Sequence, residues 1–174
     1  RAWSESTALT IDAKPWAQQA AARAQQQYLD SDHGGTVEPS KIPGLNDVHP
    51  AIPSIVTVSV VIPTIGTCDP RTGERFVDAA IESLRKAEST VPLEVIVVTT
   101  GVIDPITSAD QQVVYQPSGD FNFAEAVNLG RIHATGEYLL ILNDDTTAEF
   151  PNPVTRLLEI GQRAGVGAVG AKLT

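Results

Sequence analysis

The chain has 174 residues, of which 42% are hydrophobic and 19% are charged, and its formal net charge is −9. This composition supports about one globular domain with a real hydrophobic core, and it excludes a disordered chain. The acidity argues against a protein that binds a nucleic-acid backbone, because such proteins need a basic surface. The single cysteine, Cys68, excludes an internal disulfide and any cysteine-based zinc cluster.

The sequence starts at Arg1 and contains no methionine, so we expect it to be a piece of a longer protein. Its longest unbroken apolar run, Tyr138–Leu142, is far shorter than the roughly 20 residues of a membrane-spanning helix. We therefore expect no membrane span in this chain.

Residues 1–54 are predicted to form a helical extension followed by a proline-rich linker. Asp12 can cap a helix that tolerates Pro15 in its first turn, and the Ala/Gln-rich stretch after it stops at Gly34-Gly35. The prolines between Thr36 and Pro53 predict a linker or strap rather than a regular element.

From Ile55 onward, strands alternate with helices. Apolar or β-branched runs predict the strands Val56–Ile62, Leu93–Val98, Gln112–Gln116, Tyr138–Leu142 and Val166–Val169. The second and fourth of these runs are typical of strands buried on both faces. Apolar spacing and helix start signals predict the helices Glu74–Glu88, one from an Asn122/Glu125 capping box, and one from Asn152-Pro153 to Gly165. This alternation predicts an α/β fold with a mostly parallel sheet and helices on both faces.

Ligands of such sheets bind at the carboxyl ends of the strands, where strand order reverses. The last predicted strand end with polar residues is Asn143-Asp144-Asp145. Two adjacent carboxylates repel each other unless a cation lies beside them, and they suit Mg²⁺ or Mn²⁺ with substrate phosphates as further ligands. Two solvated aspartates in a loop are the alternative.

Two other strand ends, Pro63-Thr64 and Thr99-Thr100-Gly101, offer hydroxyl and backbone groups that could bind a nucleobase or ribose. Ordinary turn chemistry is the alternative for both. The helix after Asn122 has free N–H groups at its start and carries Asn128 and Arg131. Arg131 could reach a phosphate, and an exposed helix arginine is again the alternative.

No nucleophile is predicted. The sequence contains no Gly-x-Ser-x-Gly or Walker-type loop, and Cys68 lies in a polar loop without an identifiable base.

The ordered stretches Val58–Thr64, Glu94–Val98, Phe121–Gly136 and Glu137–Asp145 resemble family 2 glycosyltransferases. Gly167–Lys172 is similar to the next strand of that family, so the resemblance covers residues from about 56 to 174. It implies a Rossmann-like GT-A fold, of which this chain would hold the nucleotide-binding half, with residues 55–174 as a partial catalytic domain.

The resemblance also implies roles for individual residues. Asp145 would coordinate Mg²⁺ or Mn²⁺, and Asp144 would contact the ribose or the hydration shell of the ion. The remaining donor-binding residues would be Pro63, Thr64, Thr99, Thr100, Gly101, Asn128 and Arg131. The donor would be a nucleotide-diphosphate sugar, attacked with inversion by a glycan or lipid-linked acceptor.

This chain departs from the family pattern at two strand ends. Thr99-Thr100-Gly101 stands where the family usually has Asp-Asp-Gly or Asp-Asn-Gly, so the side chain that would read the base carries no charge. Asn143 stands where many members have an acidic residue.

The catalytic base of the family lies downstream of Thr174, so we expect the isolated chain to bind a donor without efficient transfer. The lead-in Val37–Pro53 is similar to multidomain bacterial enzymes that build surface polysaccharides. The expected partner is therefore the rest of the parent chain, in the cytoplasm or at the inner face of the membrane. We also expect association with a second copy, because a partial domain leaves an exposed sheet edge or apolar face. A degenerate nucleotide-binding module and, ranked lower, a sugar-phosphate nucleotidyltransferase are the alternatives.

Overall fold

The computed structural model of the chain describes residues 15–32, 34–53, 56–101, 111–116 and 119–171. The chain divides into two compact units, one made of Arg1–Ile52 with Leu158–Thr174 and the other of Pro53–Leu157. The second unit holds all three strand ends at which the sequence predicts a ligand. Within the described ranges, no helix is both long and apolar enough to cross a membrane.

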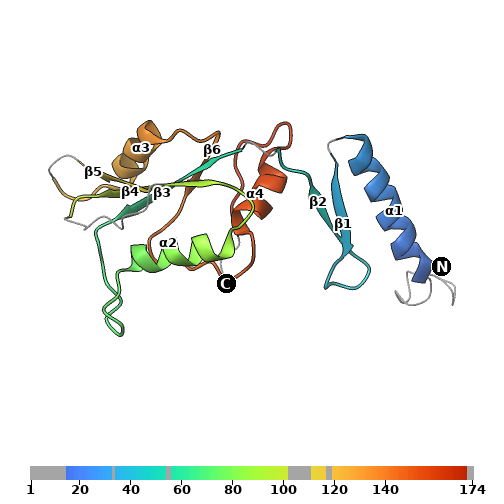
Figure 1. Ribbon diagram of the computed structural model, residues 1–174, viewed down its shortest axis with the longest axis horizontal. Coiled ribbons are helices and arrows are strands. Elements are labelled where there is room, and N and C mark those ends of the chain that lie inside the picture. Colours follow the sequence, from blue (N-terminus) through green and yellow to red (C-terminus); the bar gives the residue numbers. More distant parts are fainter. Residues whose placement is uncertain (1–14, 33, 54–55, 102–110, 117–118, 172–174) are drawn as a thin grey trace, which may run out of the picture. The chain divides into compact units, whose positions relative to one another are not determined.

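The first unit contains helix α1 (Pro15–Ser31) and an antiparallel hairpin of β1 (Gly35–Pro39) and β2 (Asn46–Pro50) (Figure 1). The helix is held to the hairpin by glutamine side chains, such as Gln26, whose amide bonds to the backbone of β1. Asp12, the predicted cap of this helix, lies outside the described residues.

The hairpin corrects the prediction of an irregular linker between Thr36 and Pro53. Pro39 and Pro50 are the last residues of their strands. Proline has no N–H to donate, and it is tolerated at strand ends where the ladder does not need that donor. The connecting turn contains Gly44 with a φ of 83°, a conformation that favours glycine. The residues that suggested irregular structure therefore mark the ends of two short strands.

The second unit is built on a four-stranded sheet in the order β5-β4-β3-β6. These strands are β3 (Val58–Thr64), β4 (Leu93–Thr99), β5 (Gln111–Tyr115) and β6 (Tyr138–Ile141). All three neighbouring pairs are parallel. The predicted α/β fold with a mostly parallel, Rossmann-like sheet is therefore confirmed.

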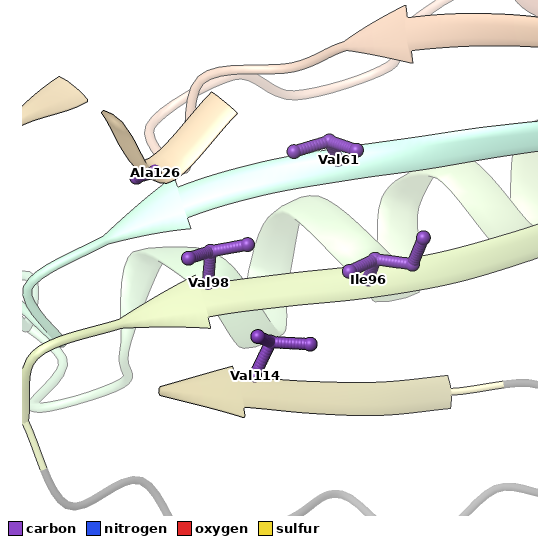
Figure 2. Packing of buried hydrophobic residues seen from close by; sticks show 5 residues of the cluster. All are labelled: Val61, Ile96, Val98, Val114 and Ala126. Atoms are coloured by element: carbon purple, nitrogen blue, oxygen red, sulfur yellow. The ribbon is translucent and has the colours of Figure 1, made fainter. Parts of the chain in front are cut away.

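Helices α2 (Phe76–Ala87) and α3 (Phe123–His133) lie on opposite faces of this sheet (Figures 1 and 2). On the α3 face, a buried cluster joins the sheet to the helix (Figure 2); it consists of Val61, Ile96, Val98, Val114 and Ala126. Gly130 lets α3 approach closely, because a Cβ at this position would lie 2.4 Å from a methyl group of Val61. The sheet is thus fixed between the helices.

The amino ends of β3 and β4 are tied together around Glu94. Its carboxylate accepts hydrogen bonds from the Ser59 hydroxyl (2.5 Å) and from the N–H (2.9 Å) and hydroxyl (3.0 Å) of Thr135. Ser59 Oγ also accepts the N–H of Gly136 at 2.8 Å. Partial burial opposes ionisation of Glu94, but these hydrogen bonds outweigh it and hold the pKa of Glu94 below its ordinary value.

Two elements differ from the predictions near the end of the chain. β6 was predicted to be buried on both faces, but it lies at the edge of the sheet, and Leu139 and Ile141 are 38% and 49% exposed. Helix α4 (Pro153–Gly161) ends before the predicted Gly165, and Val166–Val169 has no regular structure. An apolar run forms a strand only where a neighbouring strand accepts and donates its hydrogen bonds, and no strand pairs with this run in the described part of the chain.

Candidate functional site

The topology brings the three candidate strand ends to one edge of the sheet. Strands β4, β3 and β6 are adjacent and parallel, so the residues that follow them leave the sheet side by side. Thr64 and Thr99 pair directly in register. On the other side, the N–H of Leu142 donates to the carbonyl of Val61 just before the chain turns at Asn143.

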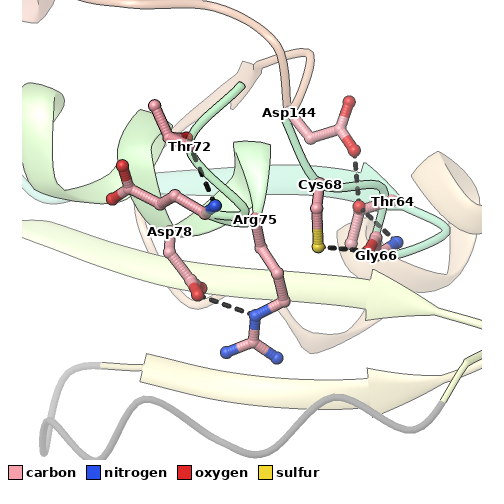
Figure 3. Close-up of polar contacts among 8 residues, drawn as sticks. Thr64, Gly66, Cys68, Thr72, Arg75, Asp78 and Asp144 are labelled. Atoms are coloured by element: carbon pink, nitrogen blue, oxygen red, sulfur yellow. Dashed lines mark hydrogen bonds and ion pairs between the residues drawn. The ribbon is translucent and has the colours of Figure 1, made fainter. Parts of the chain in front are cut away.

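Thr64 joins two of these strand ends. Its hydroxyl donates to Oδ2 of Asp144 at 2.5 Å and accepts the N–H of Gly66 at 2.9 Å (Figure 3). The side chain is enclosed, since Thr64 is only 2% exposed. Gly66 has a φ of 78°, so the turn after β3 favours glycine there. One buried threonine therefore fixes both this turn and one oxygen of Asp144.

The end of β4 repeats this turn without the carboxylate contact. Thr99 Oγ1 accepts the N–H of Gly101 at 3.0 Å, as Thr64 does from Gly66. Thr99 is 0% exposed, and its hydroxyl proton has no acceptor among the described residues. Thr100 is exposed and Gly101 is half-buried, so these two residues offer the accessible polar groups at this strand end.

The turn after β6 presents two carboxylates. Asp144 is half-buried, and only its Oδ2 is hydrogen-bonded within the described ranges. Asp145 is exposed, with no hydrogen bond or ion pair to any described residue. The turn itself is anchored, because the N–H of Thr146 donates to Asn143 and the N–H of Ala148 donates to Ser83 Oγ on α2. Unused carboxylate oxygens are thus held on a fixed turn.

These carboxylates fit a hard divalent cation that completes its coordination with ligand phosphates and water. Mg²⁺ and comparable ions are commonly bound by one or two protein carboxylates together with substrate phosphates. In the part of the chain that the structure describes, no group of three or more His, Cys, Asp or Glu side chains could hold a metal by itself. A cation here would therefore be held jointly by the protein and by its anionic ligand.

The candidates on α3 are not connected to this edge by any hydrogen bond or ion pair of a described residue. Ala126 and Gly130 are the buried residues of α3, whereas Asn128 and Arg131 are exposed. Their place in the site stays a prediction.

The start of α3 forms half of the predicted capping box. Asn122 accepts the N–H of Glu125 at 3.1 Å, as expected. The carboxylate of Glu125 instead accepts a hydrogen bond from the side chain of Gln116 at 3.0 Å. Gln116 directly follows β5, and its N–H donates to the carbonyl of Thr99. The helix is therefore tied to the end of β5.

The arginines of the loop between β3 and α2 are bonded to carboxylates. Arg71 pairs with Asp69 at 3.0 Å and Arg75 with Asp78 at 2.7 Å (Figure 3 shows the second pair). Hydrogen bonds from the side chain and backbone of Arg71 lower the pKa of Asp69. In the same loop the exposed Cys68 thiol donates to the carbonyl of Gly66 at 3.8 Å.

The sequence reasoning missed the hydrogen-bonded series Gly66–Thr64–Asp144. A local signal for half of it exists, because both β3 and β4 end in a Thr-x-Gly triplet whose hydroxyl can accept the N–H two residues later. The other half joins residues 80 positions apart, and it depends on how β3 pairs with β6.

Known proteins were compared with the chain. No family model matches it. It is 28% identical over 184 residues to the uncharacterized protein y4gI of Sinorhizobium fredii, a match that covers 99% of this chain and 20% of that protein. Its structure is similar to the mannosyltransferase PcManGT from Pyrobaculum calidifontis, determined in complex with GDP-Man and Mn²⁺. That similarity has a TM-score of 0.51 at 19% identity and covers 88% of this chain and 45% of the mannosyltransferase.

The structural similarity shows that the chain shares the fold of this mannosyltransferase over most of its length. At 19% identity it establishes the fold alone. The chain spans 20% of the length of the curated relative and 45% of the length of the solved structure.

Proposed function

We propose that this chain is the donor-binding portion of a metal-dependent, inverting glycosyltransferase of the family 2 type, with a nucleotide-diphosphate sugar as donor. The proposal depends on the Asp144-Asp145 turn, which follows the carboxyl end of β6 in the parallel sheet. One oxygen of Asp144 is hydrogen-bonded there, and the other carboxylate oxygens have no hydrogen bond to a described residue. The fold similarity to a mannosyltransferase whose structure is in complex with GDP-Man and Mn²⁺ supports this class of ligand.

In this proposal Asp145 binds Mg²⁺ or Mn²⁺, and Asp144 contacts the ribose or a water of the ion. The cation supplies Lewis-acid stabilisation of the leaving diphosphate. Thr100 and Gly101 contact the base or ribose, while Pro63, Thr64 and Thr99 form the buried floor below them. Asn128 and Arg131 remain proposed donor contacts, with Arg131 reaching a phosphate.

The net charge of −9 supports a cation-bound donor. An acidic protein does not attract a free diphosphate by its overall field, whereas a bound divalent cation offsets the charge of both carboxylates and phosphates. The acceptor would be a glycan or a lipid-linked sugar. The general base that activates it, and the acceptor surface, would come from another part of the parent protein, so we expect this chain alone to bind rather than transfer.

Calorimetric titration of GDP-mannose, UDP-glucose and dTDP-glucose, each with and without Mn²⁺, tests the proposal. We expect one nucleotide class to bind only when Mn²⁺ is present. Asp145→Asn should weaken the Mn²⁺-dependent affinity by about tenfold or more, about 1.4 kcal/mol. Glu82→Gln, which removes one exposed carboxylate from α2, is the matched control and should leave it unchanged. Binding that is absent in all cases, or equal in the two variants, would contradict the proposed site.

A degenerate binding module is the second candidate, and the end of β4 favours it. Thr99-Thr100-Gly101 carries no charge, and the Thr99 hydroxyl is buried. Such a module would bind a nucleotide while the intact parent protein neither hydrolyses nor transfers the sugar. A radiolabelled-sugar transfer assay on the parent protein separates the two functions. A nucleotidyltransferase ranks lower, since its basic loop is replaced here by arginines bonded to carboxylates.

A further inference from the structure

We propose that Thr64 is a positioning residue, whose hydroxyl holds Asp144 in the orientation in which its second oxygen serves the cation-bound donor. This inference rests on the proposed function. It also changes the expected role of Thr64, since its hydroxyl then acts on a carboxylate of the protein and not on the nucleobase.

The hydrogen bonds of Thr64 leave no donor for a ligand. A hydroxyl has one proton to donate, and that proton goes to Asp144 Oδ2 at 2.5 Å. One acceptor position of the same oxygen is taken by the N–H of Gly66 at 2.9 Å. At 2% exposure, the Thr64 side chain is buried rather than open to a ligand.

Thr99 shows that the strand-end turn does not require the carboxylate. Thr64 and Thr99 pair in register, both are buried, and both accept the N–H of the glycine two residues later. The two residues differ in the destination of the hydroxyl proton, which reaches a carboxylate only at Thr64 within the described part of the chain. The contact with Asp144 is therefore an addition to a turn that is complete without it.

The contact restricts Asp144 in a useful way. A carboxylate on a surface turn samples several orientations, and ordering it when a ligand binds reduces affinity. Because Oδ2 is fixed by Thr64, the orientation of Oδ1 is set before any ligand arrives. In this inference Asp144 contacts a water of the bound ion, so Thr64 orients a group of the cation site. Hydrogen bonds that orient metal-binding groups in this way typically raise metal affinity, and their removal lowers it by about 10–100-fold.

The test compares Thr64→Val, Thr64→Ser and Thr155→Val in the full chain. Mn²⁺ affinity is measured by electron paramagnetic resonance, alone and with GDP. We expect Thr64→Val to weaken Mn²⁺ binding about tenfold or more and Thr64→Ser to restore it to within about threefold. Thr155→Val removes a half-buried hydroxyl that donates to the carboxylate of Glu88 at 2.8 Å, outside the proposed site. It therefore controls for lost stability and should leave the affinity for Mn²⁺ unchanged.

A second measurement does not depend on any ligand. The ¹³C chemical shift of the Asp144 carboxyl, observed in metal-free protein at neutral pH, should move in Thr64→Val and stay near the wild-type value in Thr64→Ser and Thr155→Val. An unchanged shift together with unchanged Mn²⁺ affinity in Thr64→Val overturns the inference while the proposed function stands. If the wild-type chain binds neither Mn²⁺ nor nucleotide, the proposed function fails, and the carboxyl shift still decides whether Thr64 holds Asp144.

Discussion

The carboxylates at the amino ends and at the carboxyl ends of the β-strands differ in how many hydrogen bonds they accept. At the amino end, Glu94 accepts three hydrogen bonds from Ser59 and Thr135. At the carboxyl end, Asp144 accepts one, from Thr64, and Asp145 accepts none from the described residues. At the amino ends of the strands, the carboxylate is thus hydrogen-bonded within the protein. At their carboxyl ends, the carboxylates keep oxygens that are not hydrogen-bonded to described residues.

This difference separates stability from function within one sheet. A carboxylate with several internal donors stabilises the fold, and its loss leaves those donors without partners. A pair of adjacent carboxylates with few internal donors contributes little to the fold and repels itself, so its presence is better explained by a ligand. Substitutions at the two edges should therefore act on different measurable quantities.

The largest effect is expected from matched glycine substitutions at the two edges. A Cβ at Gly136, on the amino edge, would lie 2.6 Å from the Thr57 carbonyl oxygen and 2.8 Å from the Ser59 nitrogen. Backbone atoms yield little, so Gly136→Ala should reduce the free energy of unfolding by about 2–4 kcal/mol. At Gly101 a Cβ would lie 3.5 Å from its nearest neighbour, the Ile65 carbonyl oxygen. Gly101→Ala should change stability by less than about 0.5 kcal/mol in the same urea titration. Equal losses would remove the distinction between the edges.

Glu94→Gln should have the next largest effect. It weakens three hydrogen bonds to a carboxylate, and we expect a loss of about 1–3 kcal/mol at neutral pH. The pKa of Glu94 is lowered from an ordinary value of 4.5 in the folded state. The folded state therefore favours the ionised form, and this stabilisation is complete above the unfolded-state pKa and lost as the pH falls through the folded-state pKa.

Urea titrations of wild type and Glu94→Gln, from about pH 7 to about pH 3, measure this dependence. The difference in unfolding free energy should shrink as the solution becomes more acidic. A difference that stays constant over this range would mean that packing, rather than the ionised carboxylate, is lost in the variant. Mn²⁺ affinity should be the same in both proteins at neutral pH.

The interior of the fold was predictable because burial on both faces leaves a simple pattern. The continuous apolar run of β4 identifies a central strand without knowledge of its neighbours, and the β-branched run of β3 predicts the strand beside it. The outermost elements of the sheet were less predictable, because whether such an element forms a buried strand depends on the elements beside it. The apolar run of β6 predicts a strand buried on both faces, but β6 is the outermost strand of the sheet. Val166–Val169 was predicted to be a strand, but it has no strand partner among the described residues.

The candidate site divides in the same way. The carboxylates of Asp144 and Asp145 could be located from sequence, since they directly follow an apolar strand run and topology places strand ends together. The contact between Thr64 and Asp144 could not, because it requires the register of β3 against β6 and one rotamer at each residue. Sequence thus located the charges, whereas the structure shows how one of them is held.

Asp145→Asn should have the smallest effect on stability. It is also the most direct test of whether the carboxyl ends of the strands bind a ligand. The residue is exposed and has no hydrogen-bond partner in the described part of the chain, so Asp145→Asn removes no stabilising contact. It does remove repulsion with Asp144, and the melting temperature should therefore change by less than about 1 °C, in the upward direction at low salt. In differential scanning calorimetry with added Mn²⁺ and nucleotide, the wild type should then melt at a higher temperature than Asp145→Asn, because only the wild type is stabilised by the ligand. A melting temperature that falls without ligand would show that the Asp145 carboxylate supports the fold, and the contrast between the two edges would not hold.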